Sequence, residues 1–264
     1  MAAIPAAQSE GSLVERVRAY IERFETEASA IVAEEHYTQT VTSTLFRPHS
    51  ETRSRVLRSD YVLVKPSDEG PWLGYRDVFE VDGKEVRERS ARLMQILETT
   101  APDSLARAER MALEGARFNL GPERTVNTPT MPMELLASRH KARIRLRATG
   151  RTDHGPSRAV LTFEERGRPT IVRTPEGVNV VASGEIVVRV ADNAIMRARL
   201  VFRFDRRTAR NAELTMQVSY ADVPDIPVPM PLSLSEQFPI GTGSGSGDAR
   251  YSHYRRFQTT ARIR

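Results

Sequence analysis

Side chains that could perform chemistry are few in this sequence and lie far apart. No histidine lies three to five residues from another, which is the spacing of a zinc-binding pair; the five are His36, His49, His140, His154 and His253. The chain has no cysteine, so disulfides, thiolate metal sites and cysteine nucleophiles are excluded. We therefore expect no metal centre and no cofactor.

Two pairs of adjacent carboxylates are the candidates for acid–base chemistry. Glu164 and Glu165 fall in an alternating segment, and neighbours in a strand point to opposite faces, so these two cannot act together. Glu34 and Glu35 are expected to mark the end of a helix. Residues 181–185, VASGE, do not match the G-x-S-x-G turn of serine hydrolases, and no other segment is close. The sequence therefore predicts a protein that is not an enzyme.

A glycine-rich stretch, GTGSGSGD at residues 241–248, has the composition of a phosphate-binding loop but the wrong surroundings. A dinucleotide-binding loop needs a strand before it and a helix after it, and here a strand-like segment follows. We expect a flexible loop.

The last residues, Gly247 to Arg264, hold arginines interleaved with tyrosines. Strict alternation places Tyr251 on one face of an extended chain and Tyr254 on the other, so neither face is purely aromatic or purely basic. A platform for single-stranded nucleic acid would group its aromatic side chains beside a charged groove. The segment therefore favours the closing strand of a sheet, and we expect no nucleic acid partner.

Charge is divided unevenly along the 264 residues. The net charge is +5, and it separates into −4 for residues 1–120 and +9 for residues 121–264. A basic half is one signature of nucleic-acid binding. Acidic residues are dispersed among the arginines, however, which is typical of the solvent face of strands. No run approaches the roughly 20 apolar residues of a membrane-spanning helix.

The order of elements follows from the spacing of apolar residues. Helical spacing predicts one long helix from Ser12 to about Glu35, and strand-like alternation follows over residues 36–81. A helical insertion is expected at about residues 89–121, with a short helical turn near 132–138. Nearly everything beyond Ala142 alternates with period two. Four prolines between positions 224 and 231 predict an edge strand or a crossing segment there.

These elements predict an α+β fold built on a single curved antiparallel sheet. About 10 or 11 strands must curl, and a curled sheet with a dry concave face must be filled. The long N-terminal helix and the inserted helices are the available filling, giving an unclosed half-barrel. We expect one domain over residues 12–264, preceded by a disordered N-terminus at residues 1–11.

Several stretches resemble the superfamily of LolA-type periplasmic lipoprotein carriers and RseB-type sensors, especially its uncharacterised exported bacterial branch. They are ASAIVAEEHYTQ, LRSDYVLVK, WLGYRDVFEVDGKEV, RPTIVRTPEGVNVVASGEIVV and ARYSHYRRF. The resemblance implies a half-barrel that holds acyl chains between sheet and helix. It also implies a periplasmic or otherwise exported protein, although the sequence lacks the apolar stretch of a signal peptide before PAAQS.

We therefore expect a non-enzymatic protein that binds a hydrophobic small molecule, a lipid or a lipoprotein acyl chain, with peripheral contact to a membrane compatible with that role. Bulky apolar residues of the first helix and the sheet are the expected lining: Phe24, Ile31, Trp72, Phe79, Phe163, Phe202 and Met216. The alternative is an interaction module with a packed core, whose arginine-rich outer face binds an acidic partner or an anionic envelope surface.

Overall fold

The fold is described from a computed structural model. It covers residues 10–29, 31–43, 50–64, 73–87, 89, 110, 112–151, 154–174, 176–204 and 213–256. Trp72 and most of the predicted helical insertion lie outside these residues, although residues 112–116 are helical. The division into one domain and an N-terminal tail stays a prediction.

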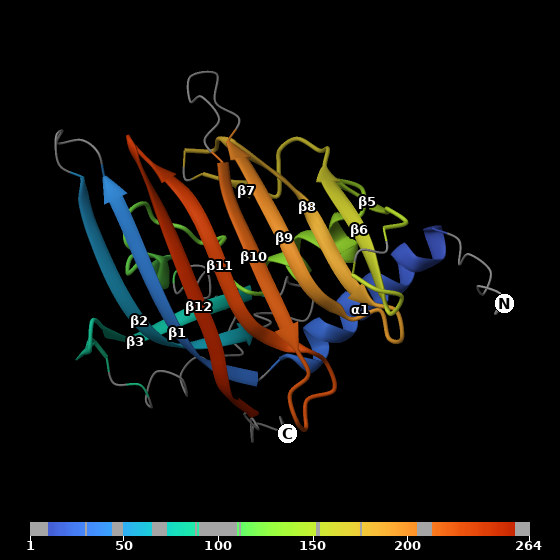
Figure 1. Ribbon diagram of the computed structural model, residues 1–264, viewed down its shortest axis with the longest axis horizontal. Helices are drawn as coiled ribbons and strands as arrows, with labels where there is room; N and C mark the ends of the chain where they lie inside the picture. The colour runs from blue at the N-terminus through green and yellow to red at the C-terminus, as the bar shows by residue number, and fades with distance from the viewer. Residues whose placement is uncertain are drawn as a thin grey trace, which may run out of the picture.

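The chain forms one antiparallel sheet of 12 strands in the order β4-β3-β2-β1-β12-β11-β10-β9-β8-β6-β5, with β7 paired to β8. The outer strands β4 and β5 do not pair with each other, so the sheet stays open, as Figure 1 shows. The predicted half-barrel is confirmed. The strands are β1 Ile31–Ser43, β2 Glu51–Val64, β3 Leu73–Val81, β4 Lys84–Glu85, β5 Ile144–Ala148, β6 Arg158–Glu165, β7 Val172–Arg173, β8 Asn179–Arg189, β9 Ile195–Phe204, β10 Glu213–Ala221, β11 Met230–Ile240 and β12 Gly243–Arg256.

Helices cover one side of this sheet. Helix α1 (Glu10–Glu27) and helix α4 (Met131–Leu136) lie behind the strands in Figure 1, and the short 3-10 helix η1 (Ser138–His140) follows α4. Val17, Ile21 and Phe24 form the buried stripe of α1. These side chains join one apolar core with the inward-facing residues of β5 to β12, because each strand alternates between a buried and a solvent face.

The first helix ends earlier than its apolar spacing predicts. Helix α1 stops at Glu27, and Ile31 is the first residue of β1, so the prediction that the helix runs to Glu35 is wrong. A short apolar run is compatible with both a helix and a strand, and here the pairing with neighbouring strands makes it a strand. Residues 31–43 pair with β2 on one side and β12 on the other, and Glu34 and Glu35 consequently point to opposite faces of a strand.

The glycine-rich segment is a strand in the middle of the sheet, because β12 starts at Gly243, so the prediction of a flexible loop is wrong. Three of the four prolines precede β11 in its connection to β10. The fourth, Pro231, lies inside β11, which pairs on both sides, so the prediction of an edge strand is wrong. Pro231 is accommodated where the β10–β11 register shifts. Glycine is required on β12 because a Cβ at Gly247 would lie 2.4 Å from the Tyr37 hydroxyl.

The predicted C-terminal strand is confirmed, but the side chain of Tyr254 lies on the opposite face from the one predicted. Two residues of β12 oppose Ala33 of β1 where the register shifts, and His253 adopts a φ of 49°. Such a bulge reverses the alternation beyond it. Tyr254 therefore points inward like Tyr251, contrary to strict alternation, and donates a hydrogen bond to the carbonyl of Pro231.

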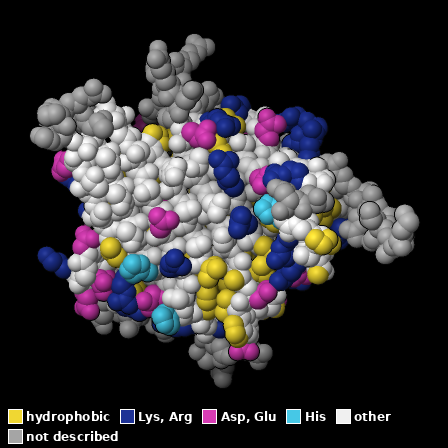
Figure 2. Space-filling view, viewed as in Figure 1, with side chains coloured by type: hydrophobic (Ala, Val, Ile, Leu, Met, Phe, Trp, Pro, Cys, Tyr) yellow, Lys and Arg dark blue, Asp and Glu magenta, His cyan; other side chains and the backbone are white. Residues whose placement is uncertain are grey.

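The outer face of the sheet has a different character. Figure 2 shows a broad area of uncharged side chains and backbone over β1, β12 and β11, with charged side chains around it. Outward-facing hydroxyls make direct pairs there: Thr40 contacts Ser54 and Thr42 contacts Thr52, both at 3.2 Å. A wet outer face opposite an inner core explains the period-two pattern of the sequence.

Candidate functional site

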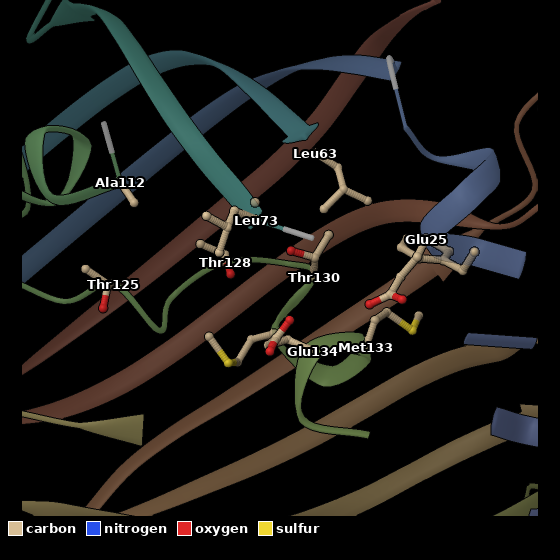
Figure 3. Close-up of a pocket in the computed structure, with 12 residues that line it drawn as sticks. Glu25, Leu63, Leu73, Ala112, Thr125, Thr128, Thr130, Met133 and Glu134 are labelled. Carbon is tan, nitrogen blue, oxygen red and sulfur yellow. The ribbon is translucent and has the colours of Figure 1, made fainter. Parts of the chain in front are cut away.

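A cavity of about 190 Å³ lies between α1, the end of β2, the start of β3, and α4. Figure 3 shows its residues converging from these elements. Its apolar lining consists of Phe24, Leu63, Leu73, Gly74, Ala112, Met131 and Met133. Its polar lining consists of Glu25, Thr125, Thr128, Thr130 and Glu134. An apolar pocket with a few polar groups at one side is the usual form of a small-molecule site.

The cavity exists because large side chains are fixed around it. Phe24 is fully buried, and its ring meets the ring of Tyr220 edge-on at 6.3 Å. Tyr61 and Thr130 share a hydrogen bond of 2.5 Å under β3. A Cβ at Gly74 would lie 1.9 Å from the Tyr61 hydroxyl, so only glycine lets β3 pass over this pair.

Residues 125–130 form a wall of the cavity through Thr125, Thr128 and Thr130, and buried hydrogen bonds hold this segment. Tyr220 donates its hydroxyl hydrogen to the carbonyl of Pro129 at 2.6 Å, and Arg76 donates to the carbonyl of Asn127 at 3.1 Å. Each bond ties a carbonyl of the wall to a strand. The shape of the cavity thus depends on β3 and β10.

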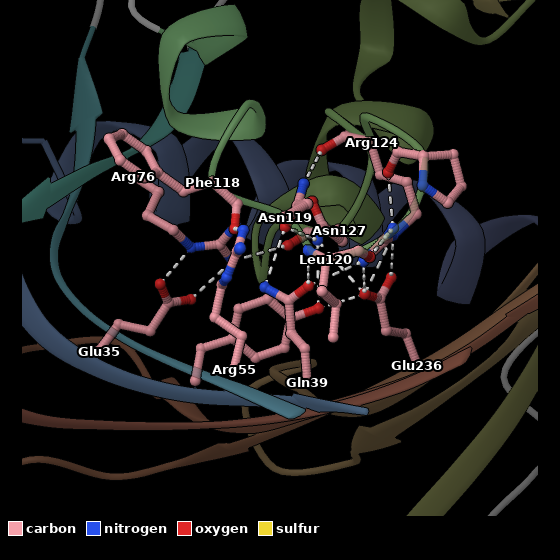
Figure 4. Close-up of polar contacts among 12 residues, drawn as sticks. Glu35, Gln39, Arg55, Arg76, Phe118, Asn119, Leu120, Arg124, Asn127 and Glu236 are labelled. Carbon is pink, nitrogen blue, oxygen red and sulfur yellow. Dashed lines mark hydrogen bonds and ion pairs between the residues drawn. The ribbon is translucent and has the colours of Figure 1, made fainter. Parts of the chain in front are cut away.

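Two ion pairs lie buried inside the half-barrel beside this wall (Figure 4). In the first, Arg76 donates two hydrogen bonds to Glu35, and Tyr251 donates a third at 2.8 Å. Only 4% of the Arg76 side chain and none of the Glu35 side chain is exposed. Burial acts to lower the pKa of Arg76, but the charge of Glu35 and its hydrogen bonds outweigh it and raise that pKa above its ordinary value.

The second pair joins Arg124 to Glu236 at 2.9 Å, with exposures of 5% and 0%. The Arg124 guanidinium also lies 3.6 Å from the centroid of the Phe238 ring, a cation–π contact. Tyr37 donates a hydrogen bond to Glu236, and burial, followed by the charge of Glu236, raises the pKa of Tyr37.

Amide side chains connect the two ion pairs into one network. Asn119 accepts hydrogen bonds from Gln39 and Asn127, each at 3.2 Å. This half of the concave face is therefore polar and filled, and the expectation of a uniformly dry concave face is wrong here. Alternation along β1 and β11 carries the missed signal, because it places Glu35, Gln39 and Glu236 on the inward face.

The structure brings two of the predicted lining residues to the cavity region. Phe24 lines the cavity itself. Ile31 lines a void of about 10 Å³ next to it, together with Phe24, Leu63 and Thr130. The two spaces share these last three residues, so they are adjacent parts of one apolar region.

The other predicted lining residues lie elsewhere. Phe163, Phe202 and Met216 are buried in the common core and do not line this cavity. Phe79 lies on the outer side of β3, outside that core, under the guanidinium groups of Arg58 and Arg89 at 5.5 and 4.3 Å. Trp72 is outside the described residues. Sequence patterns identified buried apolar residues but could not separate packing from lining.

Two carboxylates line the cavity, and one guanidinium outside the lining pairs with both. Arg139 of η1 lies 3.1 Å from Glu25 and also pairs with Glu134. His140 lies 3.1 Å from Glu134. Desolvation by burial raises the pKa of Glu25, although the charge of and hydrogen bond from Arg139 act in the opposite direction.

Two classes of site find no support in the described part of the chain. No group of three or more His, Cys, Asp or Glu residues is placed to hold a metal ion among the residues that the structure covers. None of the helices within the described ranges is both long and apolar enough to cross a membrane.

No protein-family model matches the chain, and no curated protein matches it. Three solved structures are similar over nearly the full length. A putative outer membrane lipoprotein-sorting protein domain from Vibrio parahaemolyticus is 10% identical, with 95% of each chain covered and a TM-score of 0.40. A DUF1329 family protein from Desulfovibrio piger is 9% identical, with 96% and 94% covered and a TM-score of 0.36.

The third is a LolA superfamily protein from Nitrosomonas europaea, 10% identical, with 97% of each chain covered and a TM-score of 0.33. Two of the three descriptions thus name the class of protein that the sequence resembles. At these identities and TM-scores the likeness carries no argument about ligand or activity. The open antiparallel sheet with helices on its concave side is established above from strand order and burial, independently of these three structures.

Proposed function

We propose that the chain is a non-enzymatic, exported protein that binds a hydrophobic ligand, a lipid or a lipoprotein acyl chain, in the cavity between α1, β3 and α4. The observation that supports this most is the mainly apolar lining around an open volume beside the buried core. Large side chains such as Phe24, Leu63 and Met133 surround space that they do not fill. Protein interiors seldom leave such volumes without a ligand or water.

The size of the cavity defines the ligand more narrowly. Sites for drug-sized molecules span about 300–1,000 Å³, and this cavity has about 190 Å³. The neighbouring network around Glu35 and Glu236 fills the rest of that half of the interior. The site therefore suits one apolar chain, or the end of one, rather than a lipid with two chains bound side by side.

Export to the periplasm is part of the same proposal. It follows from the sequence stretches that resemble LolA-type and RseB-type proteins. A carrier or sensor of acyl chains needs contact with a membrane or a lipoprotein and no catalytic group, which agrees with the scattered histidines and the lack of a serine-hydrolase motif.

The test is a volume-filling substitution. Ala112 lines the cavity, so Ala112→Phe places a ring in it, whereas Ala19→Phe adds the same ring to the exposed side of α1. Native mass spectrometry and lipid extraction of purified protein should show an acyl species on wild type and on Ala19→Phe, and a marked loss on Ala112→Phe. Equal occupancy of all three would contradict the proposal.

The interaction module remains a second candidate because the buried network leaves only part of the concave face for a ligand. It predicts protein that carries no acyl species and that binds anionic liposomes with an affinity that collapses as salt rises. The same purified samples, mixed with liposomes at low and high salt, separate the two functions.

A further inference from the structure

We propose that the cavity prefers amphiphiles whose polar end is an ammonium group, and that the carboxylates of Glu25 and Glu134 receive it. This inference rests on the proposed function, because the same apolar walls must hold the ligand's chain. It adds the chemistry of the head group, which those walls do not specify.

The first step is the placement of charge around the cavity. Both carboxylates line it, and Figure 3 shows Glu25 of α1 and Glu134 of α4 on the same side. No lysine or arginine is among the described lining residues. An ammonium group entering this side meets two acceptors that carry negative charge, whereas a phosphate or carboxylate head group meets two groups of like charge.

The second step is the balance of charge behind the lining. Arg139 pairs with both Glu25 and Glu134, so one guanidinium serves two carboxylates. Glu22, one turn before, accepts a hydrogen bond from the Ser138 hydroxyl at 2.6 Å, which adds no positive charge. Burial is the main cause that raises the pKa of Glu25; Arg139 opposes this increase, and the negative charges of Glu134 and Glu22 add to it.

The remaining charged groups nearby do not cancel this excess. Arg18 of α1 donates to the carbonyl of Leu136 at 3.0 Å and does not line the cavity. His140 lies against Glu134 and adds positive charge only when it is protonated. A ligand cation would therefore supply a positive charge that the described lining residues lack.

The third step is the combination of apolar and acidic side chains in one lining. Phe24, Leu63, Leu73 and Met133 line the same cavity as Glu25 and Glu134. The three threonines of the lining add neutral hydroxyls. An acidic surface cluster alone would bind cations of any kind; an acidic end on an apolar cavity selects a cation that carries a hydrocarbon chain.

The experiment uses three probes of equal chain length below their micelle concentrations: dodecylammonium, dodecanol and dodecanoate. Isothermal titration of the full chain near neutral pH should show the ammonium binding about tenfold more tightly than the alcohol, since hydrogen bonds to charged groups are worth roughly 1.5–3 kcal/mol, and the carboxylate binding more weakly than the alcohol. Glu134→Gln and Glu25→Gln should each reduce the preference for the ammonium several-fold. Glu164→Gln, which changes an exposed carboxylate of β6 outside the lining, should leave it unchanged.

The alcohol separates this inference from the proposed function. Binding of the alcohol with no preference for the ammonium, or a preference that survives both lining substitutions, would overturn the head-group inference and leave the hydrophobic site intact. No binding of any probe would overturn both. Circular dichroism of each variant confirms that a lost preference does not reflect a lost fold.

Discussion

The buried pair of Arg76 and Glu35 allows a sharp prediction about how the interior is held together. Replacing Arg76 by Met leaves the Glu35 carboxylate without its partner in a site where none of that side chain is exposed. Replacing Glu35 by Leu likewise leaves the buried Arg76 guanidinium without its carboxylate partner. Breaking a buried pair from one side costs about 3–5 kcal/mol, because an uncompensated charge stays inside the protein.

The double variant Arg76→Met/Glu35→Leu should be more stable than either single variant. It removes both charges and, among the described residues, leaves two groups without their former partners, the Tyr251 hydroxyl and the Asn127 carbonyl. An orphaned buried group costs about 1–3 kcal/mol, and apolar replacement of the pair regains packing. The expected loss for the double variant is therefore about 1–3 kcal/mol.

Urea unfolding followed by circular dichroism measures these differences, provided that the slope with denaturant is unchanged. An exposed pair, Arg166 and Glu164 with side-chain exposures of 54% and 58%, is the control, and its removal should cost less than about 1 kcal/mol. If a single variant fails to fold, the double variant should still fold. Additive losses in the double variant, or a double variant less stable than both singles, would refute the reasoning.

Two further predictions test the sheet. Gly247→Ala should lower the free energy of unfolding by about 1–3 kcal/mol through overpacking, because the new methyl meets the buried Tyr37 ring; an unchanged urea midpoint would count against this packing. Burial acts to raise the pKa of Glu34, but hydrogen bonds from Arg58 and Arg89 outweigh it and lower that pKa overall. The ionised Glu34 carboxylate therefore stabilises the folded protein above pH 4.5, and this contribution is lost as the pH falls through the folded-state pKa of Glu34. Glu34→Gln should thus be less stable than wild type at neutral pH and approach it in acid; parallel stability curves from pH 7 to 3 would contradict this.

The architecture could be predicted where one face of an element is dry. The apolar stripe that holds Val17, Ile21 and Phe24 indicated a helix packed on a sheet, and the alternation beyond residue 142 indicated antiparallel strands. Both patterns arise because one side of each element is buried, and this one-sided burial is visible in the sequence as a periodic spacing of apolar residues. The closing strand was predicted on the same ground.

The errors arose where pairing between distant segments overrode local composition. Glycines and prolines argue against a strand locally, yet the chain from 230 to 256 pairs on both sides and uses glycine to admit Tyr37 and Phe238. Sequence gave no means of foreseeing such contacts. The end of α1 near Ile31 was misplaced for the same reason.

The candidate site was only partly predictable. Phe24 was identified, but Leu73 and Met133 come from β3, next to the short outer strand β4, and from the six-residue helix α4, whose positions depend on the whole fold. Charged residues were assumed to face solvent, so the pair of Glu35 and Arg76 was not expected inside. A cavity depends on how far apart the surrounding side chains are held, and the residue types and their spacing do not give these distances.

The central claim is that an apolar chain occupies the space between α1, β3 and α4. Photo-crosslinking with a dodecanol derivative that carries a diazirine at the end of its chain, followed by peptide mass spectrometry, tests this directly. The account predicts labelling of the peptides that hold Phe24, Leu63 and Met133, with competition by unlabelled dodecanol and loss in Ala112→Phe. Labelling confined to outer-face residues of β11 and β12, or labelling that Ala112→Phe leaves unchanged, would contradict it.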